Sequence, residues 1–475
     1  MATPRLLVSF LVASIFLPLT GASKPDGFRL ASPGPVVSDD IQSLVEDHYL
    51  VEYHTESTND IASFEQKVNQ SVANSGNHYG GIVYKYDIGS FSGLHIHVSP
   101  QDYDQLKSHP AVKLIEPNAY VQHCQSRSQP QSLYKRCQGD GETSLQINNN
   151  IRFIPMKSWG AARISHRTLS QSDARNPNND GSNTFPWQYI YTSGAPRVYL
   201  IDTGIQKLNN EFNDGRAETA QNFVPESQQD SDDHGHGTHT AAIVGGAGYG
   251  IAQCPPGRIN LKGVKVLDSN GIGTWDRVLQ ALQWAKRDTD LYSLFSLSIV
   301  LLPLSGPPSK ILHSVLQVLT SPQYNMTIIA AAGNNMTSAD HFSPANSDYS
   351  ITVAAIDETD HRPWFSNYGS NVTIFAPGTN IESAWIGEKN ATMTLNGTSQ
   401  AAAHVAGIAA YFMQVHGPHT HWEMKDRLVR FATQDMVQDL GEGSPNLIAF
   451  NQVHPRPDDA NEQFVIPSNN YVGIA

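Results

Sequence analysis

Three side chains that together could perform nucleophilic chemistry occur in the order Asp202, His236 and Ser399. Ser399 follows a turn of small residues and opens an apolar run that extends to Val415, so a helix here would be buried on all sides. The N-terminus of that helix would carry free N–H groups and a dipole that favour developing negative charge, which suits a nucleophile. A serine that only caps a core helix is the structural alternative. Ser399 by itself does not separate the two interpretations.

Asp202 and His236 also have more than one interpretation when each is taken singly. Asp202 begins an Asp-Thr-Gly that is either an Asx-type turn or half of an aspartic-protease site, but the chain has no second Asp-Thr/Ser-Gly. His236 lies between glycines at the start of an apolar run and suits a general base that approaches a substrate closely. A metal cluster is not favoured, because no His-Glu-x-x-His is present. The acidic residues 230–233 just before it are interpreted as a solvated loop.

Taken jointly, the three residues predict one reaction. A serine is a weak nucleophile until an adjacent imidazole takes its proton, and a carboxylate fixes the tautomer of that imidazole. Asn334 could add an amide donor for a tetrahedral oxyanion, beside the backbone N–H of Ser399. The chain order Asp, His, Ser is one of three known for such a triad. The sequence therefore predicts acyl transfer through a serine nucleophile.

Strands and helices alternate from about residue 155 onward, which predicts a doubly wound, mostly parallel α/β sheet with helices on both faces. Sites in such sheets lie at the carboxyl ends of strands. Asp202 ends one predicted strand, and Asn334 follows another. The strands are expected at residues 197–201, 261–267, 298–302, 327–332, 351–356 and 372–375.

The first part of the chain has a different pattern. Residues 49–121 follow the order strand, helix, two strands, helix, strand, which predicts a small α+β ferredoxin-like domain. The first helix is expected at 58–71, with Ile61, Phe64 and Val68 on one face, and the last strand at 111–117. Residues 122–152 lack apolar periodicity and contain Lys135-Arg136, a candidate processing site in a linker. The predicted organisation is a signal peptide at 1–23, the small domain at 48–122, a linker with the maturation site at 123–154, the α/β domain at 155–452 and a C-terminal tail at 453–475.

Composition and charge exclude several classes of protein. The length of 475 residues allows more than one domain, and the formal net charge of −13 argues against nucleic acid as a partner. Arg5, the apolar residues 6–19 and the small residues 21–23 predict a secretory signal. This apolar run is too short to indicate a membrane span, and no other stretch is long enough. We therefore expect secretion and no membrane anchor.

Glycan acceptors and cysteines fit the same compartment. Three cysteines are few for a secreted chain of this length, so size rather than disulfides is expected to stabilise it. Cys124 and Cys137 are close enough in sequence to pair, which would leave Cys254 unpaired. Asn396 lies in an acceptor triplet inside the serine turn, where a glycan would block a site. The other Asn-x-Ser/Thr acceptors predict a glycoprotein and are Asn69, Asn325, Asn335, Asn371 and Asn390.

Beyond these separate signals, residues 155–452 resemble the subtilisin family of serine proteases, and its proteinase K branch most closely. The matching stretches are residues 198–205 around Asp-Thr-Gly, 235–239 (Gly-His-Gly-Thr-His), 263–268, 331–335, 365–370 and 397–399 (Gly-Thr-Ser). Residues 49–121 resemble the family's inhibitory propeptide, which assists folding and is then removed. Their closing Leu-Ile-Glu-Pro-Asn, residues 114–118, is the most typical piece.

The resemblance implies a role for each matching residue. Asp202 would orient the base His236, Ser399 would be the nucleophile and Asn334 the oxyanion donor, whereas His239 would be structural. Two segments would pair with an extended substrate through main-chain hydrogen bonds. They are Gly271, Ile272 and Gly273 on one side, and Leu304, Ser305 and Gly306 on the other.

Several positions depart from the family's pattern. Gln400 and Ala403 stand where the family has Met and Pro, and the absent thioether should make the site less sensitive to oxidation. Pro303 and Ser305 alter the substrate strand, because one removes an edge N–H and the other adds a side chain near the substrate backbone. Thr373 replaces a carboxylate that binds calcium in proteinase K-like enzymes, so no metal or other cofactor is expected.

The sequence thus predicts a secreted serine endopeptidase, made as a zymogen, that hydrolyses peptide bonds through an acyl-enzyme. Broad specificity is the default for the family, and the altered substrate strand keeps a narrower processing enzyme as a second interpretation. The alternative from another class is a catalytically weak secreted glycoprotein that acts by binding. The expected partners are protein or peptide substrates and the chain's own propeptide, as inhibitor and folding aid, and the protein is expected to be a monomer.

Overall fold

The computed structural model describes residues 44–54, 58–76, 78–126, 145–146, 151–156, 158–168, 185–190, 195–225, 227, 231–252 and 259–452. The predicted signal peptide, the Lys135-Arg136 pair, Cys137, Cys254 and the C-terminal tail lie outside the described residues. Within the described part of the chain, no helix combines the length and the apolarity that a membrane crossing requires.

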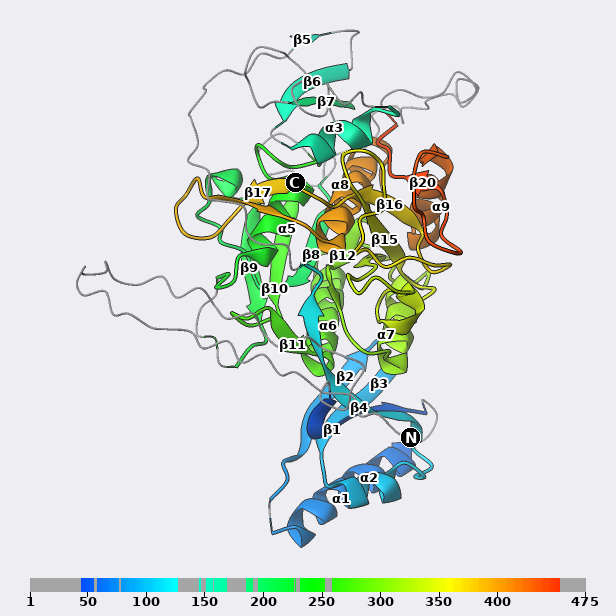
Figure 1. Ribbon diagram of the computed structural model, residues 1–475. Helices are drawn as coiled ribbons and strands as arrows, with labels where there is room; N and C mark the ends of the chain where they lie inside the picture. Colours follow the sequence, from blue (N-terminus) through cyan, green and yellow to red (C-terminus); the bar gives the residue numbers. More distant parts are fainter. Residues whose placement is uncertain are drawn as a thin grey trace, which may run out of the picture.

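The first domain is an antiparallel sheet of four strands in the order β4-β1-β3-β2, with both of its helices on one face (Figure 1). Phe64 and Val68 of α1 are fully buried against that face, as the predicted helix pattern requires. The βαββαβ prediction is therefore confirmed. The elements are β1 (Leu44–Tyr53), α1 (Thr58–Asn74), β2 (Gly81–Ile88), β3 (Phe91–His97), α2 (Pro100–Leu106) and β4 (Val112–His123).

The last strand of this domain is longer than predicted. β4 was expected to end near residue 117, but it continues to His123 and leaves the small domain for the larger one (Figure 1). Residues 123–126, which were assigned to a linker, therefore make defined contacts with the second domain. The predicted linker also contains the short strand β5 (Leu145–Gln146) and the beginning of β6 (Ile151–Met156), which continues into the predicted α/β domain.

The second domain is built on a nine-stranded sheet in the order β19-β20-β16-β15-β14-β12-β8-β10-β9. All neighbouring strands from β20 to β9 pair in parallel, and β19 alone is antiparallel to its neighbour. The predicted parallel α/β sheet is therefore confirmed. Its strands are β8 (Arg197–Asp202), β9 (Ala217–Asn222), β10 (Asn260–Lys265), β12 (Ser298–Leu302), β14 (Thr327–Ala331), β15 (Ile351–Ile356), β16 (Ile374–Pro377), β19 (Thr433–Gln434) and β20 (Leu447–Ile448).

Helices cover both faces of this sheet because successive side chains of each strand point to opposite faces. Val198 and Leu200 of β8 join the core beneath α5 and α8, whereas Tyr199 and Ile201 join the core beneath α6 and α7. Every residue of α8 from Thr398 to Gln414 is buried, as its uniformly apolar sequence predicts. The helices are α3 (Trp159–Ser165), α5 (His236–Gly245), α6 (Trp275–Leu291), α7 (Lys310–Thr320), α8 (Thr398–His416) and α9 (His421–Phe431), with 3-10 turns η2 (Asn210–Phe212) and η3 (Ala339–His341).

Five further strands of the described residues lie outside the main sheet. β17 (Ile381–Ala384) and β18 (Thr392–Leu395) form an antiparallel pair, and β7 (Phe185–Ile190) pairs with β6. β11 (Ile272–Thr274) and β13 (Leu304–Ser305) pair with β4 of the first domain instead.

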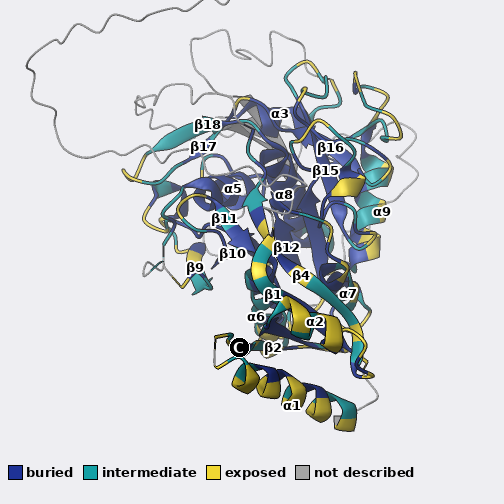
Figure 2. Ribbon diagram, turned by 60° about the horizontal axis from the view of Figure 1, so that its bottom comes forward, coloured by how far each residue is buried: buried dark blue, intermediate teal, exposed yellow. Residues whose placement is uncertain are grey.

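The two domains share an apolar interface and two helix caps. The sheet face of the first domain that α1 and α2 leave open packs on α6 and α7, with Leu50 and Phe91 in the shared core. The outward side of α1 is exposed (Figure 2). The Glu116 carboxylate accepts hydrogen bonds from Ser309 and from the backbone N–H of Lys310 at the start of α7. The Asn118 side chain bonds to Asp276 in the first turn of α6.

Candidate active site

Asp202 and His236 are brought together at the carboxyl edge of the sheet, as predicted. Asp202 is the last residue of β8 and His236 the first of α5, and both side chains are fully buried. His236 Nδ1 lies 2.8 and 2.9 Å from the two carboxylate oxygens of Asp202. The carboxylate also accepts hydrogen bonds from the Thr203 N–H at 2.7 Å and from the Thr240 hydroxyl at 3.0 Å. This set of contacts fixes the imidazole with Nδ1 toward the carboxylate and leaves Nε2 as the outward nitrogen.

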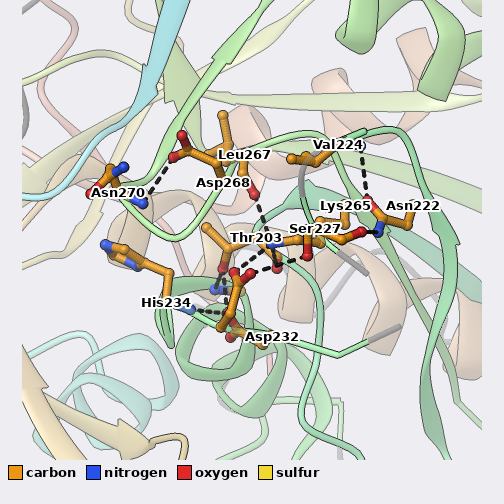
Figure 3. Close-up of polar contacts among 12 residues, drawn as sticks. Thr203, Asn222, Val224, Ser227, Asp232, His234, Lys265, Leu267, Asp268 and Asn270 are labelled. Carbon is orange, nitrogen blue, oxygen red and sulfur yellow. Dashed lines mark hydrogen bonds and ion pairs between the residues drawn. The ribbon is translucent and has the colours of Figure 1, made fainter. Parts of the chain in front are cut away.

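The loop after β8 is held by Asp232, which the sequence analysis assigned to a solvated loop. That assignment is wrong for Asp232: the residue is buried, because its carboxylate satisfies the free N–H groups at the start of α5. It accepts hydrogen bonds from the Gly235 N–H at 2.7 Å and the Thr238 N–H at 2.9 Å. It also accepts one from the Thr203 hydroxyl at 2.8 Å (Figure 3). Asp232 thereby joins the two segments that carry Asp202 and His236.

A buried ammonium group supports the same loop from β10. Lys265 has no exposed side-chain surface, and its Nζ donates to the Thr203 and Leu267 carbonyls at 2.9 Å each and to Asp233 at 2.6 Å (Figure 3). A buried charge is tolerated only when it is paired and hydrogen-bonded in this way. Lys265 therefore fixes the backbone immediately after Asp202.

Close approach of the two loops depends on a glycine. A Cβ atom on Gly237, the second residue of α5, would lie 2.1 Å from the Gly204 carbonyl oxygen. No side chain fits there, so the Gly-His-Gly pattern at His236 has a steric cause.

Ser399 and Asn334 meet at the N-terminus of α8. The Asn334 Oδ1 accepts hydrogen bonds from the Thr398 N–H at 3.0 Å and from its hydroxyl at 2.9 Å. Asn334 Nδ2 is buried and has no hydrogen-bond partner among the described residues. Thr398 therefore orients the amide through its oxygen. The amide nitrogen remains available to donate a hydrogen bond beside the start of α8.

The site is occupied by the chain's own β4. This strand lies between β11 and β13 and pairs antiparallel with both. Gln122 is opposite Ile272 on one side and Ser305 on the other, and the His123 N–H donates to the Gly271 carbonyl at 3.2 Å. Gly273 and Leu304 pair with the same strand, and a Cβ on Gly306 would lie 2.8 Å from Val121. The six residues predicted to contact a substrate thus all lie against β4.

Immediately after β4, Cys124 reaches Ser399. The Cys124 carbonyl oxygen accepts a hydrogen bond from the Ser399 N–H at 3.2 Å, and its N–H donates to the Pro303 carbonyl at 3.1 Å. A Cβ on Gly397 would lie 2.2 Å from that Cys124 oxygen, which is why the turn before Ser399 needs glycine. Beyond it, the Ser126 N–H donates to the Asn396 carbonyl at 2.6 Å. The peptide bond between Cys124 and Gln125 therefore lies at Ser399.

The Ser399 hydroxyl is not hydrogen-bonded to His236. Ser399 Oγ donates to the Pro303 carbonyl at 2.8 Å, and His236 Nε2 has no hydrogen-bond partner among the described residues. The ring of His123 stacks on His236 instead, with centroids 4.7 Å apart, and lies 4.8 Å from the ring of His234. Burial lowers the pKa of His123 well below its ordinary value, and the neighbouring His236 and His234 lower it further.

Cys124 is a buried free thiol, so the expected pairing with Cys137 is wrong. Its side chain is buried in the main core of the second domain. Burial raises the pKa of the thiol to about 12, while hydrogen bonds with the Ser305 and Thr398 side chains partly oppose that rise. A thiol with a raised pKa is poorly reactive.

Other predicted residues lie outside the immediate chemistry. His239 is fully buried and its Nε2 contacts the carbonyls of Ile381 and Met393 at 3.1 Å each, a structural position as expected. Gln400 is fully buried, with both amide atoms lacking a partner among the described residues. No group of three or more metal-ligating side chains is placed to hold an ion within the part of the chain that the structure describes. The glycan acceptors Asn69, Asn335 and Asn390 are exposed, and Asn325 and Asn371 are partly buried.

Comparison with known proteins identifies the two domains. Residues 194–449 match the subtilase family, and residues 44–123 match the peptidase inhibitor I9 family. Subtilisin-like protease 2 of Pseudogymnoascus destructans is 32% identical over 444 residues, which cover 93% of this chain and 97% of that protein. The cuticle-degrading protease of Metarhizium anisopliae is 30% identical, over 89% of this chain and 94% of that protein.

A solved structure gives the same result for the fold. The crystal structure of a cold adapted subtilisin-like serine proteinase aligns with a TM-score of 0.53 at 32% identity, covering 62% of this chain and 97% of that one. The fold and the comparisons define a serine endopeptidase of the subtilisin type, preceded by an inhibitory propeptide domain. The chain belongs to the subtilase family.

Proposed function

We propose that this protein is a secreted zymogen whose mature form cuts protein chains through Ser399 as nucleophile. One observation carries the proposal: an extended segment lies paired on both sides in the site, with the Cys124 carbonyl oxygen on the Ser399 N–H. This is the placement that a substrate needs for attack on its carbonyl carbon. No observation in the described structure favours a protein that acts by binding alone.

The proposed mechanism uses four residues. Ser399 Oγ turns from the Pro303 carbonyl to His236 Nε2, gives up its proton there and attacks the carbonyl carbon of the bound chain. The resulting oxyanion accepts hydrogen bonds from the Ser399 N–H and from Asn334 Nδ2. His236, oriented by Asp202, then returns the proton to the leaving amine, and water hydrolyses the acyl-enzyme by the same steps.

Maturation would begin when the enzyme cleaves its own peptide bond between Cys124 and Gln125. This bond lies at Ser399, whereas Lys135-Arg136 follows it by eleven to twelve residues in the sequence. After this cut, the first domain would stay bound as an inhibitor, because its apolar face and its two helix caps do not depend on the broken bond. The cut would leave Cys124 at the end of the propeptide and Gln125 at the start of the enzyme.

Expression of the full chain in a secreting host tests this proposal, with Ser399→Ala and Arg136→Ala as variants. We expect the wild type to yield two fragments, one ending at Cys124 and one beginning at Gln125, by N-terminal sequencing and intact mass. Ser399→Ala should remain a single chain at that bond, whereas Arg136→Ala should be cut there normally. Cutting of Ser399→Ala between Cys124 and Gln125 would contradict self-processing.

Secretion and glycosylation belong to the same proposal. They are supported by the sequence of residues 1–23 and by the exposure of Asn69, Asn335 and Asn390. The secreted protein should lose mass when treated with an endoglycosidase that removes Asn-linked glycans. An unchanged mass would contradict the glycoprotein assignment without affecting the proposed chemistry.

A further inference from the structure

Three residues of the second domain contact the ring of His123, the residue before Cys124. The His123 ring stacks on the ring of His236, with centroids 4.7 Å apart and an angle of 30° between the planes. The ring of His234 lies 4.8 Å away at an angle of 47°. A Cβ atom on Gly271 would lie 2.1 Å from His123 Cδ2 and 2.5 Å from its Nε2, so the ring edge rests on bare backbone. We call His234, His236 and Gly271 the ring site.

The ring site is held in place by contacts within the second domain. The His234 N–H donates to Asp232 Oδ1 at 3.0 Å, and His234 Nδ1 accepts a hydrogen bond from the His236 N–H at 3.3 Å. Gly271 ends a turn in which its N–H donates to the Asp268 carbonyl at 2.9 Å, and its φ of +74° favours glycine. The ring site therefore does not depend on the bound segment for its shape.

His234 has no part in the proposed mechanism, yet its side chain extends to the bound segment. It reaches from its own loop toward Asn270, the residue before Gly271 (Figure 3), and its Nε2 would lie 3.3 Å from a Cβ on Gly271. Because Nδ1 accepts a hydrogen bond, this imidazole is neutral and carries its hydrogen on Nε2. Burial lowers the pKa of His234, and the neighbouring His236 lowers it further. His234 thus offers an uncharged ring to the bound segment.

We propose that His234 sets the specificity for the residue second from the cut, where it selects a flat, uncharged ring at the position of His123. The inference rests on the proposed function, because it takes the segment that ends at Cys124 as an image of a bound substrate. It makes His234 a specificity-determining residue, and it names the preferred substrates as chains with histidine, phenylalanine or tyrosine at that position.

Two physical effects favour a ring there. A ring between two imidazoles gains stacking contacts that leucine or valine cannot form. Its face also lies 4.7 Å from the His236 ring, within the distance at which an aromatic face attracts a cation. His236 becomes positively charged when it takes the proton of Ser399. A lysine at the same position would instead place a second positive charge beside His236.

Peptides that copy residues 120–126 test the inference, with only the position of His123 varied among His, Phe, Tyr, Leu, Val and Lys. The processed enzyme, freed of its propeptide, is assayed for kcat/KM under reducing conditions at about pH 8, where a histidine in a peptide is neutral. Casein serves as a general protein substrate. We expect the His, Phe and Tyr peptides to exceed the Leu, Val and Lys peptides by about 3- to 10-fold. Equal rates for Phe and Leu would overturn the inference.

Two variants of one residue test whether His234 causes the preference. In His234→Ala, the ratio of kcat/KM between the Phe and Leu peptides should fall toward one, because one wall of the ring site is lost. In His234→Phe, the ratio should return, because a flat ring is restored without an imidazole. His341→Ala is the matched control, at an exposed histidine of η3, and should leave the ratio unchanged. The ratio is measured within each variant, so a general loss of activity does not enter it.

The outcomes distinguish this inference from the proposed function. If casein is cut but the ratio is the same in His234→Ala as in the wild type, or if His234→Phe fails to restore it, His234 does not select a ring and the inference fails alone. If casein is cut but none of the peptides is, the bound segment is not an image of a substrate and the inference also fails. If neither casein nor any peptide is cut, the proposed function itself fails.

Discussion

Asn334 is the residue whose role follows most directly from its own contacts. Its Oδ1 is held by Thr398, and its buried Nδ2 has no partner among the described residues. A buried donor without a partner is costly unless it serves a state in which an acceptor forms. The acceptor that we propose is the oxyanion of the transition state.

Asn334→Ala should therefore lower kcat by about 100- to 1000-fold and leave KM nearly unchanged, because the missing bond forms only in the transition state. Steady-state kinetics on a peptide substrate would measure both constants. Asn213→Ala, at an exposed asparagine, is the control. A loss of kcat no larger than that of the control would exclude Asn334 from oxyanion binding.

Single residues with a local signature could be predicted from the sequence, and residues without one could not. Asp202, His236 and Ser399 each lie where a strand ends or a helix begins, so their positions and order were visible in the chain. Lys265 and Asp232 bind groups from segments distant in sequence, such as Thr203. Their role depends on how β8, β10 and α5 come together, which no local pattern records.

At the scale of elements, β4 is the main difference from the sequence analysis. The strand was predicted to end near residue 117, but it continues to His123. Residues 120–123 of β4 pair with β11 and β13 of the second domain. A strand whose partners belong to another domain gives no turn or breaker signal at that boundary. Predicting its true length requires knowing that the first domain docks on the site.

Three neighbouring histidines, of which His95 is buried, lie on β1 and β3 of the same sheet. His48 is 2.8 Å from His95 and stacks on His97, and His95 lies 3.5 Å from Asp276 of α6. Burial lowers the pKa of His48 to about 4, helped by His95 and His97 and opposed by Asp276. Burial also lowers the pKa of His95, against the opposing charge of Asp276.

The pKa shift of His123 predicts that acid weakens the binding of the propeptide. His123 has a lower pKa in the complex than when released, because the site that buries it and the neighbouring His236 and His234 belong to the second domain. The shifts of His48 and His95 do not add to this effect, because Asp276, the neighbouring charge from the second domain, raises their pKa values. The stabilisation from His123 is complete above about pH 6.5 and is lost as the pH falls toward its pKa in the bound state. This histidine can make the affinity fall by up to about tenfold per pH unit.

The processed complex, still bound to its propeptide, should therefore become active faster after exposure to about pH 5 than at about pH 7.5. Activity is read on a peptide substrate after return to neutral pH, so that all samples are assayed under the same conditions. His123→Gln should flatten the pH dependence, whereas His54→Gln, at an exposed histidine, should not. A release rate that does not change with pH would refute this prediction.

For the molecule as a whole, the sequence predicted both domains and their classes but not how they join. The alternation of apolar strands and helices defines the parallel sheet, and the βαββαβ order defines the small domain. The interface is made of side chains such as Leu50 and Phe91, which look like ordinary core residues in the sequence. Only the assembled structure shows that they pack on α6 and α7 and deliver Cys124 to Ser399.

The proposed activity of the whole molecule requires that Ser399 is the nucleophile of the processed enzyme. Treatment of that enzyme, freed of its propeptide, with diisopropyl fluorophosphate tests this directly, with the modified residue located by peptide mass spectrometry and the residual activity measured in parallel. We expect one adduct, on Ser399, whose formation follows the loss of activity, and none on Ser399→Ala. An enzyme that keeps its activity, or that carries no adduct on Ser399 when its activity is lost, would contradict the account.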